Sequence, residues 1–419
     1  MRGVTPQELR ELERFTERVM ERARRMGLDF FDMRFEVVPA DVLYAFGAYG
    51  MPTRFAHWSF GKAYHRMKME YDYNLSRIYE LVVNSDPCYA FLLDGNTLLQ
   101  NKLVIAHVLG HSDFFKNNAH FRGTSRYMMD TMAAHAERIA RYEFQYGREE
   151  VEAVLDAALA LAEQVDPHPV GPPSQEEPQS AARRPARPST PYDDLWALDE
   201  RLARETGAPG GPAGAGAAPT ASAHGAGFSG AGGGPGAPSP AGRSAGEARP
   251  GWPRGPGSGS GPALGPARRR ARKLPLRPEK DLLRFLMEHS DYLESWQRDI
   301  LAMVREEMLY FWPQMATKIM NEGWATYWHL QLMREEELDE ADAVEFARMH
   351  AGVVQPHRLH VNPYLLGLKI WESIEKRWNE PTPEEQRRLG RQPGQGRAKM
   401  FEVRELESDV SFVANYLTE

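Results

Sequence analysis

The apolar positions of the first 165 residues recur mostly at helical spacing, with one stretch that alternates instead. Residues 33–38 (MRFEVV) alternate apolar and polar side chains, which predicts a short strand. Gly50 and Gly147 each follow a helical run, as helix-ending glycines do. The pattern predicts helices over 1–28, 39–50, 62–84 (with an apolar strand at its end), 96–115 and 124–147, and a turn followed by an apolar strand over 84–96.

The chain after residue 276 is also patterned as helices. Two helices are predicted in 276–336, punctuated by Pro313, because proline lacks the backbone donor that a helix interior needs. Further helices are predicted at about 338–350, 363–377 and 404–417. The expected fold class is therefore mainly α, an α+β arrangement with a small sheet.

Residues 166–276 have a different composition, dominated by Pro, Gly, Ala and Ser. Such a tract buries too little apolar surface to offset its ordering entropy, so we predict a long disordered insertion. The flanking segments, 1–165 and 277–419, are predicted to be the two halves of one composite domain. A long insertion is tolerated there because the cost of loop closure grows only logarithmically with length.

Two stretches of this tract stand out. Residues 190–205 (TPYDDLWALDERLARE) have a helical pattern with aromatic anchors, which fits either a short docking element or a transient helix. Residues 267–273 (ARRRARK) are strongly basic. A solvated charge cluster explains them more simply than a patch for nucleic acid or an acidic partner.

Composition and charge narrow the class of protein. Charged residues make up 26% and hydrophobic residues 42% of the chain, which is typical of a soluble globular protein. The net charge of −7 gives no case for nucleic-acid binding. One cysteine, Cys88, excludes an intramolecular disulfide and fits a reducing compartment. No signal peptide and no run of about 18 apolar residues is present, so we expect no membrane span and a cytoplasmic protein.

Candidate metal chemistry begins with a histidine pair in "AHVLGHSDFFKNN" (106–118). His107 and His111 are spaced i and i+4, which places both imidazoles on one face of a helix and within reach of a shared divalent metal. Such a pair commonly takes a carboxylate from a later helix as third ligand, with water completing the tetrahedron. The metal acidifies that water into a nucleophile. We expect Zn²⁺ here, with Glu322 as the third ligand.

The stretch "NEGWATYWH" (321–329) supplies that carboxylate. Glu322, Thr326 and His329 fall on one helical face among Trp and Tyr residues. The segment resembles the asparagine-glutamate-glycine-aromatic-alanine sequence that provides the third ligand in gluzincin metallopeptidases. By that resemblance, Asn321 helps to fix the turn, and the small Gly323 and Ala325 let two helices approach in a gluzincin-like pairing. Trp324 and Thr326 are expected to line the pocket.

One position departs from the gluzincin pattern. The residue after the first histidine is there a glutamate that acts as general base, whereas here it is Val108. Hydrolysis then needs a substitute proton acceptor, for which Asp113, Glu306, Glu307 and His329 are candidates. A solvated helix face is the simpler explanation of Glu306 and Glu307. The sequence leaves three roles open for His329: fourth ligand, acid/base group or hydrogen-bonded core residue.

Other polar residues are candidates for lining a pocket. His57, Ser59 and Lys62 lie in "HWSFGK" (57–62), and Asn117 and Asn118 follow the histidine helix. Cys88 lies in an apolar run and is predicted to be a packing residue rather than a nucleophile. His135 and His350 lie on amphipathic helices, where core or interface positions are expected.

A family resemblance rests on six motifs that lie in order across both segments. These are "HWSFGK", "NSDPCYAFLLDGN", "AHVLGHSDFFKNN", "TKIMNEGWATYWH", "NPYLLGLKIWESIEKRW" and "FEVRELESDVSFVANYLTE". Together they resemble the stage V sporulation protein R (SpoVR) family over nearly everything except about 166–276, which resembles an expanded linker. The resemblance implies a cytoplasmic bacterial protein linked to spore cortex formation. In other bacteria it implies association with a serine protein kinase and a von Willebrand factor A-type protein. Members often continue past the last motif, so a C-terminal extension is expected to be missing.

Two functions compete at this point. The first is a zinc-dependent, gluzincin-like hydrolase of peptide or amide bonds, for which the sporulation setting suggests a cell-wall peptide or precursor as substrate. The second is a non-catalytic regulatory or scaffold protein of the kinase system, in which any metal is structural. Val108 favours the second, whereas the ionisable stripe of Glu322, Thr326 and His329 opposite a histidine pair favours the first.

Overall fold

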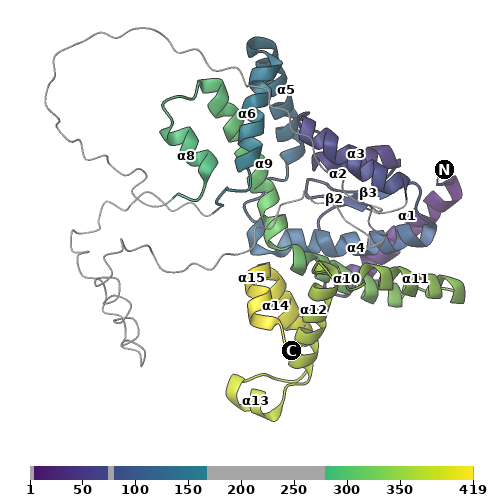
Figure 1. Cartoon of the computed structure of the whole chain (residues 1–419). Coiled ribbons are helices and arrows are strands. Elements are labelled where there is room, and N and C mark those ends of the chain that lie inside the picture. Colours follow the sequence, from purple (N-terminus) through teal and green to yellow (C-terminus); the bar gives the residue numbers. More distant parts are fainter. Residues whose placement is uncertain (1–3, 74–79, 168–278, 419) are drawn as a thin grey trace, which may run out of the picture. The chain divides into compact units, whose positions relative to one another are not determined.

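A computed structural model describes residues 4–73, 80–167 and 279–418. The described chain is mainly helical with one small sheet, which confirms the predicted fold class (Figure 1). The segment before residue 168 contains α1 (Pro6–Arg25), β1 (Met33–Val38), α2 (Ala40–Tyr49), α3 (Trp58–Asp72), β2 (Glu80–Val83), β3 (Cys88–Leu93), α4 (Leu98–Asn117), η1 (Ala119–Phe121), α5 (Met128–Tyr146) and α6 (Arg148–Leu161).

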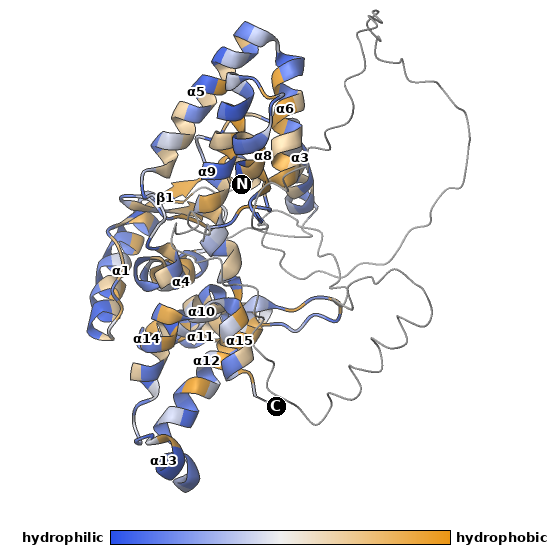
Figure 2. Cartoon of the chain, turned by 90° about the vertical axis from the view of Figure 1, so that its left-hand side faces the viewer, coloured by the Kyte–Doolittle hydropathy of each residue, from blue (hydrophilic) through white to orange (hydrophobic). Residues whose placement is uncertain are grey.

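The segment after residue 278 is helical throughout its regular elements. It contains α8 (Leu282–His289), α9 (Ser295–Ala316), α10 (Lys318–Arg334), α11 (Glu340–Val353), α12 (Pro363–Asn379), α13 (Pro383–Leu389), α14 (Gly396–Leu406) and α15 (Asp409–Tyr416). Of these, α13 has no buried residue and is mostly hydrophilic in Figure 2.

Most predicted elements are present, and the differences have local causes. The strand over 33–38 is confirmed, and Gly50 ends α2 in the left-handed conformation at φ 76°. Pro313 lies inside α9, so the break between the two helices comes at Thr317, whose hydroxyl donates to the Pro313 carbonyl. A single helix over 404–417 is wrong, because Ser408 caps a separate helix.

The sheet has the strand order β1-β3-β2. β1 pairs with β3 in parallel, with Met33 opposite Cys88, and β2 pairs with β3 antiparallel, with Glu80 opposite Leu92. β3 is therefore the central strand, and its residues are almost all buried. The pairing places Glu80 at the start of the strand β2, beside the helix α4 that both β2 and β3 contact.

The main core joins the two segments that flank residues 168–278. One cluster of buried apolar side chains draws on α1, α4, α10, α12, α14 and α15. Two close contacts set the spacing of its central helices. A Cβ added to Gly110 of α4 would lie 2.7 Å from Ala325 Cα of α10, and one added to Gly323 would lie 2.3 Å from the Gly367 carbonyl carbon of α12. The helix α10 is thus pressed between α4 and α12 (Figure 1).

Two predictions on domain organisation are not decided here. The disordered insertion over 166–276, including 190–205 and 267–273, falls almost entirely outside the described residues. The boundaries 1–165 and 277–419 stay predictions, although α4 and α10 from the two halves pack in direct contact.

Among the described residues, no helix combines the length and apolar character that crossing a membrane requires.

The helix contacts predict that replacing two different glycines by alanine has opposite effects on stability. Gly323→Ala should lower the free energy of unfolding by about 1–3 kcal/mol or more, because the new methyl group would meet backbone atoms that cannot rotate away. Gly352→Ala is the matched control, since no atom lies within 4 Å of its added Cβ in α11. It should raise stability by up to about 1 kcal/mol through helix propensity. Urea unfolding of both variants measures this, and equal stabilities would contradict the close approach of α10 and α12.

Candidate metal centre

The histidine pair lies on α4, a helix whose start is fixed by its own sequence. Thr97 and Gln100 form a reciprocal capping box at the N-terminus. From there the helix runs 20 residues, and nearly every side chain after its first turn is buried. His107 and His111 stand edge to face on one side of α4, with ring centroids 4.7 Å apart. Their i, i+4 spacing therefore produces the juxtaposition that the sequence predicts.

Two carboxylates approach this pair from different elements. Glu322 Oε2 of α10 lies 3.5 Å from His111 Nε2 and 3.9 Å from His107 Nε2. Glu80 Oε1 of β2 lies 3.5 Å from His107 Nε2. Ligand atoms of Glu80, His107 and His111 all lie within 4.8 Å of one another, so these three residues could hold a metal ion. All four residues are buried, with 3–9% of their surface exposed.

The spacing of these atoms suits a zinc-sized ion. Zinc–ligand bonds of about 2.1 Å in a tetrahedron put neighbouring ligand atoms about 3.4 Å apart. The observed separations of 3.5–3.9 Å are close to that edge length. In addition, Glu80 Oε2 and Glu322 Oε2 are buried and make no hydrogen bond with any described residue. Buried carboxylate oxygens are normally paired or bound to a metal, so the donor set fits a cation.

The pKa shifts of the four groups also favour a bound cation. Burial lowers the pKa of His107 to about 3 and that of His111 to about 4, so both imidazoles are neutral at neutral pH. Burial, with the nearby negative charge of Glu322, raises the pKa of Glu80 well above its usual range. Burial also raises the pKa of Glu322, partly offset by His111 and Lys318. A divalent cation would relieve the charge that burial penalises here.

Hydrogen bonds behind the imidazoles direct their nitrogens toward the carboxylates. His111 Nδ1 lies 2.9 Å from Asn321 Oδ1, which can only accept, so the His111 proton is on Nδ1 and Nε2 is free to bind metal. Asn321 therefore lies inside α10 and orients a ligand, rather than fixing a turn. His107 Nδ1 lies 2.9 Å from His329 Nδ1, and His329 Nε2 lies 3.1 Å from His350 Nδ1. His329 thus contacts the side of His107 that faces away from Glu80 and Glu322.

Tyr364, near the start of α12, completes the surroundings of the site. Its hydroxyl is hydrogen-bonded to Glu322, and its ring stacks on His107 with centroids 6.0 Å apart. Burial and the charges of Glu322 and Glu80 raise its pKa well above the usual range, so it remains a donor. The contact of Gly323 with Gly367 brings α12 close enough for this bond.

The remaining candidates near α4 and α10 have structural contacts. Thr326 donates to the Glu322 carbonyl, a helix-internal bond. Trp324 donates its indole N–H to Asp113, which also accepts the backbone N–H of Asp29. Burial raises the pKa of Asp113 to about 6, but its contacts tie helices together and do not include the histidine pair. Asn117 donates to the carbonyls of Asp29 and Asp113, and Asn118 donates to those of Arg404 and Glu407.

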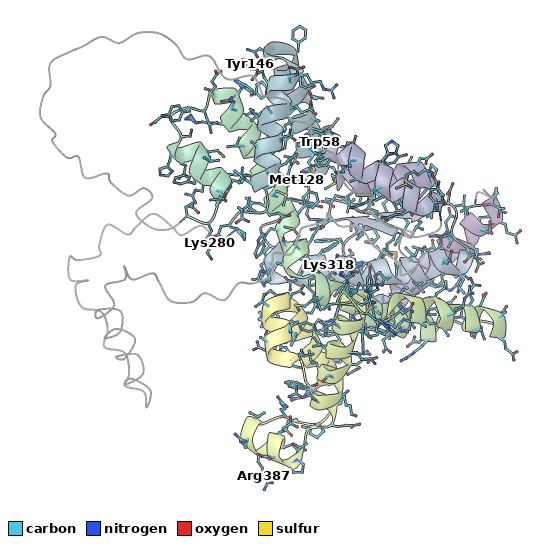
Figure 3. The ribbon with its side chains drawn as sticks, in the orientation of Figure 1. Trp58, Met128, Tyr146, Lys280, Lys318 and Arg387 are labelled. Carbon is cyan, nitrogen blue, oxygen red and sulfur yellow. The ribbon has the colours of Figure 1, made fainter. Side chains whose placement is uncertain are left out.

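Other candidates lie in separate clusters. His57 caps α3 and is hydrogen-bonded to Ser59, and its Nε2 lies 3.1 Å from Asp156 of α6. The neighbouring Trp58, labelled in Figure 3, donates its indole N–H to Asp156. Lys62 is exposed on α3. The structure thus ties the "HWSFGK" residues to α6.

Glu307 is fully buried in an ion pair with Arg54 and a hydrogen bond with His135. Its predicted place on a solvated helix face is therefore wrong, and its charge is used within that cluster. Glu306 is largely exposed beside His135. Cys88 is buried, and burial raises the pKa of its thiol to about 11, which agrees with a packing role.

Two residues of the centre escaped the sequence patterns. Glu80 falls within a stretch that was interpreted as helix followed by apolar strand, yet it opens β2 directly. A lone carboxylate at the head of the apolar run "ELVV" was the available signal, because a buried strand rarely tolerates an unpaired charge. Tyr364 carries no such signal, since aromatic residues at helix starts are common.

Comparison with known proteins matches this chain to a family. The sequence model described as "SpoVR like protein" matches residues 6–212 and 261–419. The chain belongs to the SpoVR family. A relative, "Uncharacterized protein YcgB" of Escherichia coli (strain K12), is 30% identical over 382 residues, covering 87% of this chain. The chain spans 63% of that relative's length. No solved structure matches the chain.

The family match extends into the tract over about 166–276, which the sequence motifs leave outside the SpoVR resemblance. The match continues through residue 212 and resumes at 261, so only 213–260 falls outside it. The helical pattern over 190–205 and the basic run over 267–273 therefore both lie within the matched ranges of the SpoVR family.

The pKa shifts predict proton release on metal binding. Metal-free Glu80 and Glu322 keep their protons to higher pH than usual, whereas His107 and His111 are already neutral. Affinity for Zn²⁺ should therefore rise with pH through the raised carboxylate range and level off above it, because a divalent cation favours the ionised form of both carboxylates beside it. Calorimetry at neutral pH in two buffers of different ionisation enthalpy measures the released protons. Release that is unchanged in both Glu80→Gln and Glu322→Gln would contradict the assignment.

Proposed function

We propose that this SpoVR-family chain is a zinc-dependent hydrolase of peptide or amide bonds. The observation that carries the proposal is the convergence of two neutral imidazoles with two buried carboxylates whose Oε2 atoms have no hydrogen-bond partner. A structural core gains nothing from such oxygens, because each costs about 1–3 kcal/mol when left unsatisfied. A cation between them turns this cost into binding energy.

The distances favour Glu322 as the third ligand. Its Oε2 approaches both imidazole nitrogens, at 3.5 and 3.9 Å, whereas the close contact of Glu80 is with His107. Asn321 and Tyr364 hold the ligand set by hydrogen bonds to His111 and Glu322. A divalent ion held there supplies Lewis-acid polarisation of a substrate carbonyl and activation of a water.

Glu80 is the proton acceptor in this proposal. Val108, fully buried, occupies the place of the gluzincin base and cannot take a proton. Glu80 approaches from the sheet instead, next to the ligand His107, and its raised pKa suits it to take up a proton from water and pass it to a leaving amine. Glu80 therefore replaces the four candidates suggested by sequence, of which Asp113 and Glu307 have other contacts.

The biological setting follows from the family. SpoVR proteins are linked with sporulation and spore cortex formation, so we propose a cell-wall peptide or its precursor as substrate and a cytoplasmic location. The relative YcgB is longer than this chain, and the activity of the whole protein is part of the same proposal.

A second candidate is a non-catalytic regulator with a structural metal. It is favoured by Val108 and by the burial of all four groups, which leaves little room for a substrate. In this alternative the protein acts with a serine protein kinase and a von Willebrand factor A-type protein, and the metal only joins β2, α4 and α10.

Metal content tests the site itself. Purified wild-type protein should contain about one zinc per chain by mass spectrometry, and Glu322→Ala should lose it because a ligand and its charge are removed. His135→Ala is the matched control, since it removes a buried histidine that bonds Glu307 outside the centre. It should keep the metal. A folded wild-type protein that holds no zinc, even after reconstitution, would rule out the hydrolase and leave only a regulator without metal.

Glu80→Gln separates catalysis from structure. The amide cannot take up a proton, so hydrolysis of a fluorogenic peptide mixture should fall by about 10²–10⁴-fold while zinc stays bound. Hydrolysis by wild-type protein that survives this change would remove Glu80 from the mechanism. Zinc loss in Glu80→Gln would make Glu80 a ligand, and no hydrolysis by zinc-loaded wild-type protein would favour the regulator.

A further inference from the structure

Three histidines form a continuous hydrogen-bonded chain that begins at the metal centre. His107 of α4 contacts His329 of α10 through their Nδ1 atoms at 2.9 Å. His329 continues through Nε2 to His350 Nδ1 of α11 at 3.1 Å. His329 is fully buried with both nitrogens engaged, whereas His350 is only partly buried. The chain therefore runs from the proposed ligand to a peripheral helix.

The number of ring protons limits how the hydrogen bonds between these three histidines can be arranged. A neutral imidazole carries one N–H, and each nitrogen–nitrogen hydrogen bond requires one donor and one acceptor. His329 uses both of its ring nitrogens in such bonds, one to His107 and one to His350, so it donates in one bond and accepts in the other. Only two arrangements satisfy both bonds. In one, every proton points outward, from His107 toward His350; in the other, every proton points inward.

The two arrangements differ in whether His107 Nε2 carries a proton. With outward protons, His107 donates from Nδ1, and its Nε2 carries a free lone pair toward Glu80 and Glu322. With inward protons, His107 Nε2 carries the hydrogen and would donate to those carboxylates, 3.5 and 3.9 Å away. Only the outward arrangement is compatible with a metal on Nε2.

We propose that His329 and His350 are positioning residues that hold the proton of His107 on Nδ1 and so keep Nε2 as a metal donor. The inference rests on the proposed metal function and gives His329 a role among the three left open by the sequence. His329 acts through His107, as Asn321 acts through His111. Each ligand histidine is thus oriented from α10, but the His107 support extends one residue further, to α11.

His350 is the residue to change, because α11 contains no fully buried side chain and a substitution there should leave the core intact. His350→Ala removes the acceptor for His329. His350→Asn retains one, since its side-chain oxygen can take the place of Nδ1. His289→Ala is the matched control, because this partly buried histidine also lies in the last turn of its helix, but its Nδ1 contacts the Phe285 carbonyl on α8.

Zinc affinity, measured by competition with a chromophoric chelator, gives the first readout. His350→Ala should weaken binding by roughly 10-fold, the lower end of the range for outer-shell partners. His350→Asn should restore most of it, and His289→Ala should equal wild type. Equal affinity in His350→Ala, equal loss in His350→Asn or the same loss in His289→Ala would overturn the inference. Wild-type protein that binds no zinc would overturn the proposed function as well.

Nitrogen-15 NMR of the histidine rings gives a second readout that a merely structural role would not produce. Zinc-loaded wild-type protein should show His329 and His350 protonated on Nε2 and His107 on Nδ1. In His350→Ala the signals of His329 should lose this single form, because its outward acceptor is gone. Zinc-loaded protein with His329 protonated on Nδ1 would overturn the inference while leaving zinc binding, and the proposed function, intact.

Discussion

The structure depends on one close crossing between α4 and α10. Gly110 lies against the backbone of Ala325, so the two helices meet with almost no side chain between them. This contact brings an imidazole pair from before residue 168 to a carboxylate from after residue 278. A second close contact, between Gly323 and Gly367, adds α12 and with it Tyr364. Small residues at two crossings therefore position every group of the centre except Glu80.

The same crossing buries carboxylates at an electrostatic cost, which a bound cation would lower. Burying two carboxylates beside two neutral imidazoles is unfavourable, and the pKa values of Glu80 and Glu322 rise accordingly. The far sides of the imidazoles are hydrogen-bonded, His111 to the Asn321 oxygen and His107 to His329, and Tyr364 is hydrogen-bonded to Glu322. The near sides of both imidazoles face the carboxylates. Such a division, with oriented ligands and unsatisfied inner atoms, is the arrangement expected of a metal site and not of a packed polar core.

Local patterns were sufficient to predict much of this arrangement. The spacing of His107 and His111 predicts that both lie on one helix face, and the resemblance to the gluzincin segment implies a helix contact at Glu322. Ala325 does face α4, but Gly323 faces α12. The sequence does not show this difference, since a glycine allows a close helix contact without indicating which helix makes it. Glu80 and the partner of His329 could not be predicted, since they depend on strand pairing and on the docking of α11, which are set by tertiary packing.

The most direct test of the central claim is the X-ray absorption spectrum of the protein loaded with one equivalent of zinc. The account predicts nitrogen and oxygen ligands at about 2.0–2.2 Å, with the outer-shell scattering of two imidazoles. Glu322→Ala should remove part of this first shell. A spectrum without imidazole scattering, or one unchanged by that substitution, would contradict a metal centre built from both halves of the chain.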